Sequence, residues 1–167
     1  MNQLQLILMR HGKAEKGPTG LPDHDRQLAS RGRLNAREQA HTFRPEAADG
    51  MIVSSAKRTQ QTADILFETW TELGTPASAM PMRRDTPHGY LASADKWMSL
   101  IAMEQGPSRL WVVAHNPGVS ELVMLLTGQY IGMTTADIVQ IDMDLTAWND
   151  IAPGQGHVTR HRTGRGV

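Results

Sequence analysis

The sequence predicts an α/β fold, a three-layer α/β/α sandwich with a mostly parallel central sheet. Short apolar runs alternate along the chain with longer segments of helical periodicity, which is the pattern of a parallel sheet covered by helices on both faces. The length of 167 residues fits one domain, and 40% apolar with 20% charged residues is a globular composition. We therefore expect a single domain over residues 1–167.

The first half of the chain supplies two strands and two helices. Residues 4–9 are short and apolar, which indicates a buried strand, and residues 51–53 indicate a second one. A Gly- and Pro-rich loop over residues 17–25 precedes a helix at about residues 28–43. Helix-compatible sequence with an apolar stripe then runs from Ser55 to about Leu73.

The second half continues the alternation. A weak strand is predicted at residues 80–83, and Ser93 is typical of the N-cap of a helix that runs through Met103. Residues 110–114 form the third clear strand, and Pro117 suits the first turn of a helix that ends near residue 126.

The last part of the chain divides into a strand and a tail. Residues 136–144 alternate apolar and polar side chains with the period of a β-strand. Residues 154–167 are rich in Gly and Arg, and we expect them to fray.

Composition excludes several classes of function. The chain has 17 basic and 17 acidic residues and zero formal net charge, which argues against a dedicated nucleic-acid-binding protein. No apolar run approaches the ~20 residues of a membrane span, and residues 1–10 lack the cationic region of a secretory signal. Cysteine is absent, which excludes disulfides, thiolate catalysis and cysteine-ligated metals. We expect a cytoplasmic protein.

Three predicted strands end in polar clusters. In open α/β sheets ligands bind outside the carboxyl ends of the strands, so these clusters should converge on one cleft. They are Arg10-His11-Gly12, Ser54-Ser55 leading to Arg58, and His115-Asn116-Pro117-Gly118.

The residue types in these clusters favour phosphoryl transfer. Two arginines, always charged and with forked donors, would clamp a phosphoryl group. Histidine is the side chain that acts as a neutral nucleophile or proton carrier near pH 7. Helix starts after Ser55 and Pro117 would add backbone N–H donors and positive dipole ends. Positioning and charge neutralisation are what phosphoryl transfer mainly requires.

The same clusters resemble a known family. Three blocks, each after a predicted strand, are similar to the histidine phosphatase superfamily of phosphoglycerate-mutase-like proteins: residues 8–12 with the Arg-His-Gly triplet, residues 54–63, and residues 113–118. The small size and the segments 28–32 and 90–93 resemble the SixA branch, the short phosphohistidine phosphatases. The resemblance covers roughly residues 4–150.

The resemblance implies roles for individual residues. His11 would be the nucleophile that forms a phosphohistidine intermediate, Arg10 and Arg58 would bind the phosphoryl oxygens, and His115 would stabilise the transferring group. No metal or other cofactor is implied, because the arginines neutralise the charge. Further substrate-binding candidates are Gly12, Ser54 and Asn116; helix capping is the alternative for Ser54, and capping or orienting His115 is the alternative for Asn116.

One part departs from the superfamily. Larger members supply a Glu as general acid, whereas residues 82–89 contain none; Asp85 and His88 are the possible substitutes. An imidazole is a better leaving group than an alkoxide, so the missing acid favours phosphohistidine on a protein as substrate. Two alternatives stay open: a small-molecule phosphomonoesterase or mutase, and a catalytically silent phosphate-binding module.

For several other basic residues the sequence gives weaker indications of a role in binding. Lys13 is expected to be solvated or to add to the positive field at the cleft. Arg26 and Arg31 are candidates for the cleft mouth, with an ordinary surface position as the alternative. His157 and His161 have the spacing of metal ligands but lie in the tail, where an incidental spacing is the favoured interpretation.

Overall fold

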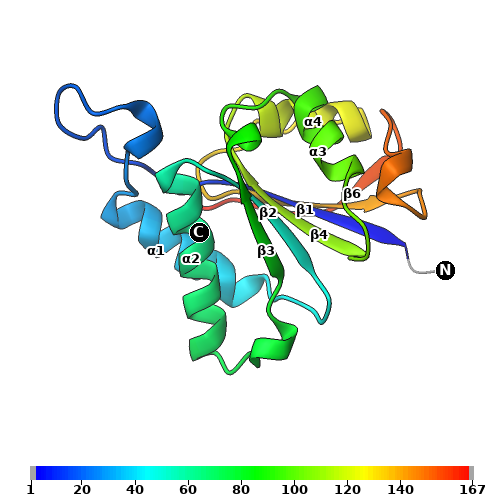
Figure 1. Ribbon diagram of the computed structural model, residues 1–167, viewed down its shortest axis with the longest axis horizontal. Coiled ribbons are helices and arrows are strands. Elements are labelled where there is room, and N and C mark those ends of the chain that lie inside the picture. The colour runs from blue at the N-terminus through cyan, green and yellow to red at the C-terminus, as the bar shows by residue number, and fades with distance from the viewer. Residues whose placement is uncertain (1–2, 166–167) are drawn as a thin grey trace.

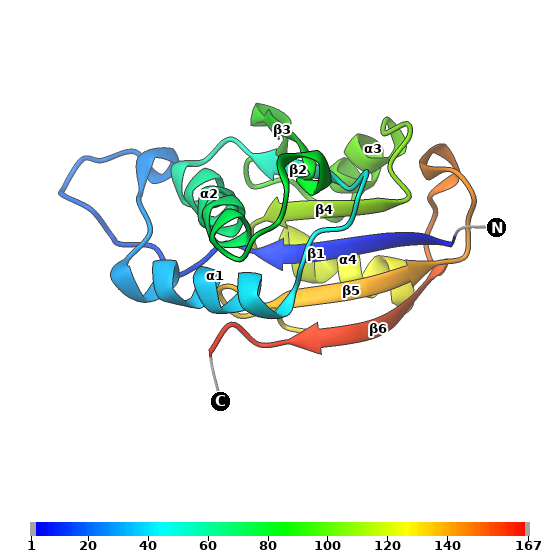
Figure 2. The same ribbon diagram turned by 90° about the horizontal axis from the view of Figure 1, so that it is seen from below.

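The computed structural model describes residues 3–165, and within this range six strands form one sheet in the order β3-β2-β4-β1-β5-β6 (Figure 2). Strands β3, β2, β4 and β1 pair in parallel, and β5 runs antiparallel to both of its neighbours, β1 and β6. The mostly parallel sheet is therefore confirmed. The strands are β1 (Leu4–Arg10), β2 (Gly50–Ser54), β3 (Met82–Thr86), β4 (Arg109–Ala114), β5 (Ile138–Met143) and β6 (Gly156–Arg162).

Helices cover both faces of the sheet (Figure 1), which confirms the three-layer architecture. The two helices α1 and α2 pack on one face, and α3 and α4 pack on the other. Four short 3-10 helices, η1 to η4, lie in the connections. The bounds are α1 (Ser30–Thr42), α2 (Lys57–Glu72), α3 (Ala94–Ala102), α4 (Gly118–Thr127), η1 (Asp23–Asp25), η2 (Ala77–Ala79), η3 (Pro87–Gly89) and η4 (Trp148–Asp150).

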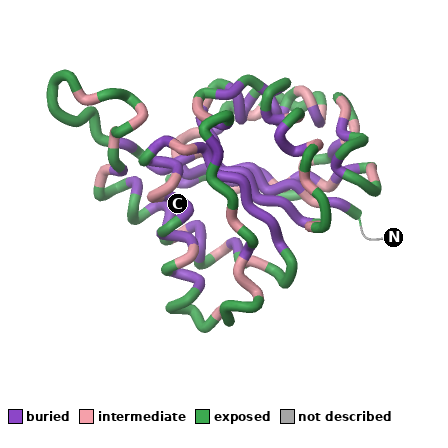
Figure 3. The backbone as a smooth tube through the Cα atoms, in the orientation of Figure 1, coloured by how far each residue is buried: buried purple, intermediate pink, exposed green. Residues whose placement is uncertain are grey.

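Two apolar cores lie on the two faces of the sheet. Successive strand side chains point to opposite faces, so Leu8 of β1 joins the core under α3 and α4, whereas Met9 joins the core under α1 and α2. The central strands are buried on both faces (Figure 3), which explains their continuous apolar runs. Each core holds a fully buried indole, Trp97 in the first and Trp70 in the second.

The helix signals are confirmed at α3 and corrected at α2. Ser93 caps α3, its side chain accepting a hydrogen bond from the Lys96 backbone N–H at 3.2 Å. Helix α2 starts after Ala56, with no side-chain cap, so Ser54 does not cap it. Gly128, with φ 71°, ends α4 in the left-handed conformation that glycine adopts without strain.

Two predictions about strands need correction. The weak strand predicted at residues 80–83 lies at Met82–Thr86. The tail does not fray over its described part, because Gly156–Arg162 form β6, paired with β5; residues 166–167 lie outside the described residues. Charged side chains along an edge strand conceal the apolar alternation that usually reveals a strand. None of the described helices is long and apolar enough to cross a membrane.

Candidate active site

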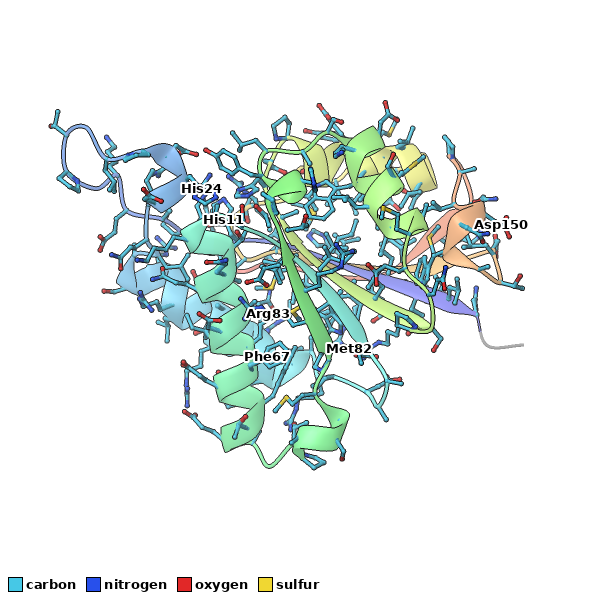
Figure 4. All side chains as sticks on the ribbon, viewed as in Figure 1. His11, His24, Phe67, Met82, Arg83 and Asp150 are labelled. Carbon is cyan, nitrogen blue, oxygen red and sulfur yellow. The ribbon has the colours of Figure 1, made fainter. Side chains whose placement is uncertain are left out.

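The carboxyl ends of β1, β2 and β4 meet at one edge of the sheet, where the predicted clusters come together. His11 and Arg10 lie at the end of β1, His115 follows β4, and Arg58 lies in the first turn of α2. Figure 4 shows His11 at this end of the sheet and Asp150 at the far end. The four side chains line one cavity of about 220 Å³, called here the phosphoryl pocket. Its walls are Arg10, His11, Lys13, Ala14, Arg26, Arg58, Leu91, His115, Asn116 and Thr135.

His11 is held as a neutral ring in which Nε2 carries no proton. Its Nδ1 lies 2.7 Å from the Gly12 carbonyl oxygen, which can only accept, so Nδ1 carries the proton. Nε2 is then unprotonated, and the Arg58 Nε–H donates to it at 3.3 Å. Burial lowers the pKa of His11 to about 4, helped by the positive charges of Arg58 and Arg10.

His115 faces His11 with 5.2 Å between the ring centroids. Ser54 Oγ lies 2.7 Å from His115 Nε2. The Ser54 hydroxyl has no other acceptor among the described residues, so it donates to Nε2, and the neutral ring carries its proton on Nδ1. That nitrogen is buried without a hydrogen-bond partner within residues 3–165. Burial lowers the pKa of His115 to about 3, and the neighbouring His11 and the positive charge of Arg58 act in the same direction.

Arg58 is 4% exposed and is fixed by the loop before α1. Its Nη1 donates to the Asp23 carbonyl oxygen at 2.7 Å and its Nη2 to the Asp23 carboxylate at 3.0 Å. The same carboxylate accepts from the Tyr90 hydroxyl at 2.6 Å and from Arg26 at 3.0 Å. The Tyr90 hydrogen bond, followed by those from Arg26 and Arg58, holds the pKa of Asp23 well below its usual range. Asp23 is therefore a charged anchor for the guanidinium.

Arg10 reaches the cavity from the last position of β1. Its Nη1 donates to the Met133 carbonyl oxygen at 3.0 Å, and its Nε is buried without a partner among the described residues. Burial and the nearby Arg58 lower the pKa of Arg10, although an arginine stays protonated. An unpaired buried donor is costly, and an anion in the phosphoryl pocket is the kind of group that could satisfy it.

Three further candidates are engaged in hydrogen bonds within the protein. The Gly12 N–H donates to Thr62 Oγ1 at 3.1 Å, so it is not free for a substrate. Ser54 is fully buried and is engaged with His115. The Asn116 amide donates to the Met133 carbonyl oxygen at 2.8 Å and accepts from Ser120 at 2.7 Å. Among these candidates, Asn116 alone lines the phosphoryl pocket.

Gly12 also permits a close approach between the loop after β1 and the start of α1. A Cβ on Gly12 would lie 2.6 Å from the Gly32 carbonyl oxygen, and one on Gly32 would lie 2.2 Å from the Lys13 carbonyl oxygen. Both distances are too short for any side chain, so glycine is required at both positions. The beginning of α1 is thereby packed against the residues that follow His11.

Neither candidate for the general acid reaches the pocket. Asp85 lies on β3 and pairs with Arg83 at 2.7 Å, and it accepts a hydrogen bond from Gln60 at 3.2 Å. His88 is an exposed residue of η3. The residues that line the phosphoryl pocket include no Asp or Glu. Neither Asp85 nor His88 is among the residues that line the pocket, so this structure does not position either of them as the acid, and the general acid from this segment stays a prediction.

Three residues that the sequence did not single out, Asp23, Tyr90 and His24, lie beside the site. His24 Nε2 lies 2.9 Å from Ser55 Oγ, and its ring packs edge-on against Tyr90, which in turn contacts the His115 ring. Figure 4 shows His24 at the same end of the sheet as His11. The charged run from Asp23 to Arg26 inside a Gly- and Pro-rich loop was the available signal, but a charged loop is more often plain surface.

A cavity larger than the phosphoryl pocket lies elsewhere. Its volume is about 650 Å³, and its walls include Leu4 and Trp148, at the opposite end of β1 from His11. Its walls include no histidine or arginine, so the candidate catalytic residues do not lie in this larger cavity. Among residues 3–165 there is no group of three or more His, Cys, Asp or Glu side chains that could hold a metal ion.

A protein-family match covers three of the four residues that meet in the pocket. The model described as "Histidine phosphatase superfamily (branch 1)" matches residues 6–85, which contain Arg10, His11 and Arg58. Over these residues the chain is similar to the histidine phosphatase superfamily. This similarity supports a phosphatase, but it does not identify the substrate, which depends on the residues of the site. No curated protein matches the chain.

Solved structures described as phosphatases share the fold. A protein described as a candidate phosphohistidine phosphatase SixA from Nakamurella multipartitia is 21% identical, with TM-score 0.76 and coverage of 95% of each chain. A histidine phosphatase SixA bound to tungstate is 22% identical, with TM-score 0.73 and coverage of 96% of this chain and 97% of that one. A candidate alpha-ribazole-5'-P phosphatase from Escherichia coli is 14% identical, with TM-score 0.67 and coverage of 93% and 94%. At these identities the likeness concerns the fold.

Replacing Asp23 with Asn tests its role as a positioning residue. We expect kcat/KM for an aryl phosphate to fall about tenfold, mainly through KM, because Arg58 loses its charged anchor and is less well oriented for the phosphoryl group. Asp25→Asn in the same short helix is the matched control, since Asp25 contacts neither arginine nor tyrosine. Equal kinetics in Asp23→Asn and Asp25→Asn would contradict the role.

Proposed function

We propose that this protein is a metal-independent phosphatase that works through a phosphohistidine on His11 and removes phosphoryl groups from phosphohistidine on another protein. The observation that carries the proposal is the neutral His11 ring, whose Nε2 lone pair points at the guanidinium of Arg58. A nucleophile needs that lone pair, and a phosphoryl group needs the adjacent positive charge.

The reaction divides into two transfers. His11 Nε2 attacks phosphorus, a new P–N bond forms, and the bond between phosphorus and the substrate imidazole breaks as that imidazole takes up a proton from solvent. Water then attacks the phosphorus on His11, which releases inorganic phosphate and restores the neutral ring. Arg10 and Arg58 neutralise the oxygens in both steps, and His115 is available as a further donor through Nδ1.

The substrate class follows from what the pocket walls contain. No carboxylic acid lines the phosphoryl pocket to protonate a leaving alkoxide. An imidazole leaves without a strong acid, so the walls favour a phosphoramidate over an alkyl ester. The structural neighbours named as phosphohistidine phosphatases support the same choice. The cytoplasmic location expected from the sequence belongs to this proposal and is tested by fractionating cells of the native host.

A substrate panel tests the proposal. Phosphohistidine peptides, sugar phosphates, phosphoglycerates and an aryl phosphate are compared in buffer with EDTA, and the quenched enzyme is examined for an acid-labile, alkali-stable label. We expect the highest kcat/KM for the phosphohistidine peptides and no loss in EDTA. A preference of several orders of magnitude for one alkyl ester would instead establish a phosphomonoesterase or mutase. Tight phosphate binding without turnover would establish a silent binding module.

The pH dependence follows from the two histidines. Burial lowers the pKa of His11 to about 4 and that of His115 to about 3, below the ordinary value of 6.5. The folded protein therefore binds fewer protons than the unfolded chain between about pH 4 and 6.5, so the free energy of unfolding should fall as the pH is lowered through this range. The nucleophile should stay neutral down to about pH 4. Proton NMR titration of the ring Cε1–H signals checks this, and a titration of His11 near 6.5 would contradict it.

A further inference from the structure

A second, smaller pocket adjoins the phosphoryl pocket. It has a volume of about 110 Å³, and we call it the second pocket. Lys13 and Thr135 line both pockets, so the two are adjacent. The walls of the second pocket are Lys13, Arg31, Asn35, Thr135 and Arg165.

The charge along these two pockets is strongly one-sided. The walls carry six of the 17 basic residues and none of the 17 acidic ones, although the whole chain has zero formal net charge. Within residues 3–165, none of the three cations of the second pocket forms an ion pair with a carboxylate. The six basic residues are Arg10, Lys13, Arg26, Arg31, Arg58 and Arg165.

The position of Arg31 increases the positive potential. It lies in the first turn of α1, which has no acidic residue and no side-chain cap. A cation at this end of a helix is repelled by the partial positive charge of the terminus. An anion there is attracted both by the terminus and by the Arg31 side chain. One turn further along, Asn35 is 8% exposed, and its side-chain hydrogen bond is a long one to Glu38, 3.4 Å from Nδ2. The pocket wall thus includes a buried amide with spare hydrogen-bonding capacity.

Three separate segments are packed together to form the second pocket. The Ala29 N–H donates to the Lys13 carbonyl oxygen at 2.8 Å, which joins the start of α1 to the loop after β1. The Gly164 N–H donates to the Asp137 carboxylate at 2.7 Å, and the same carboxylate accepts from Thr134, beside Thr135. Figure 2 shows the chain after β6 running alongside α1. Strand β6 therefore delivers Arg165 to the pocket.

We propose that Lys13, Arg31 and Arg165 form a second anion site, which binds a further negatively charged group of the molecule whose phosphoryl group occupies the phosphoryl pocket. This inference rests on the proposed phosphatase function and narrows its substrates to those with two separated anionic groups. The chemistry is a carboxylate or a second phosphate: an acidic side chain near the phosphohistidine of a protein, or the other end of a small bisphosphate.

Matched peptides test the protein source. In one set a single Glu, and in the other a single Gln, occupies each position within three residues of the phosphohistidine. For at least one position we expect about tenfold higher kcat/KM with Glu, and Arg31→Gln should bring this ratio close to one. Arg33→Gln is the matched control, because Arg33 is exposed on the same helix and lines neither pocket. Its Glu-to-Gln ratio should equal that of the wild type.

Alkane bisphosphates test the small-molecule source without any turnover. Calorimetry compares bisphosphates with three- to six-carbon spacers against the corresponding monophosphates, for the wild type, Arg31→Gln and Arg165→Gln. We expect the wild type to bind one of the bisphosphates at least tenfold more tightly, and both variants to lose that advantage. The inference is overturned if Glu has no effect at any position and no bisphosphate binds more tightly than its monophosphate.

The two hypotheses fail in different ways. If no phosphohistidine peptide is hydrolysed, the proposed function fails, while an Arg31-dependent preference for a bisphosphate still supports the second anion site. If the peptides are hydrolysed equally well with Glu and Gln, and the bisphosphates show no preference, the second anion site fails and the phosphatase stands.

Discussion

Replacing His11 with Asn is expected to lower kcat by roughly a thousandfold or more and to remove the acid-labile phosphoenzyme label. Asparagine is polar and small enough for the site, but it has no ring nitrogen with a lone pair where His11 has Nε2. Without that atom the phosphoryl group cannot be transferred to the protein, so both the first step and the intermediate disappear. Quenched-flow labelling together with steady-state turnover measures the effect.

His157→Asn is the matched control for this variant. His157 is exposed on β6 and pairs with Asp144, at the far end of the strand from Arg162, so turnover should equal that of the wild type. Circular dichroism and thermal unfolding establish that both variants are folded. Turnover within tenfold of the wild type in His11→Asn, or an undiminished label, would falsify the nucleophile assignment.

The second large effect is expected for Arg58→Lys, which should lower kcat/KM by about a hundredfold to a thousandfold. Lysine keeps the positive charge but lacks the forked N–H donors of the guanidinium. In the wild type these donors contact His11 through Nε and Asp23 through Nη1 and Nη2. A single ammonium cannot make these contacts and also bind a phosphoryl oxygen, because its donors lie on one nitrogen. Kinetics with an aryl phosphate and inhibition by vanadate report the loss.

Arg37→Lys is the matched control, since Arg37 is exposed on α1 and pairs with Glu72 far from the pocket. Its kinetics and vanadate affinity should be those of the wild type. Arg58 is buried, so the free energy of unfolding is measured for both variants to separate catalysis from stability. Should Arg58→Lys bind vanadate as tightly as the wild type, the guanidinium would not be the anion clamp.

Most strands were visible in the sequence because burial on both faces leaves a local signature. Residues such as Ile52 and Val112 are covered by helices on either side, so their strands read as short apolar runs. Strand β6 left no such signature. It is an edge strand in which His157 and Arg160 face solvent, and only its pairing with β5 makes it a strand.

The convergence of Arg10, His11, Arg58 and His115 was predictable, since parallel strands place their carboxyl ends at the same edge of a sheet. The hydrogen-bond partners of the neighbouring polar side chains were not predictable from the sequence. Whether the Ser54 hydroxyl meets a substrate or the His115 ring depends on side-chain direction. The role of Asp85 also depends on side-chain direction, because its carboxylate pairs with Arg83 and does not line the pocket.

The sequence alone determined the layer architecture and the four charged or ionisable groups at the strand ends, because both depend on local apolar patterns and on residue type. Only the tertiary structure decided which other side chains contact these four groups or lie beside them. Asp23 reaches Arg58 from a loop 35 residues earlier, and Arg165 reaches the second pocket from the end of the chain. Such contacts arise from the packing of distant segments, and no pattern within one segment encodes them.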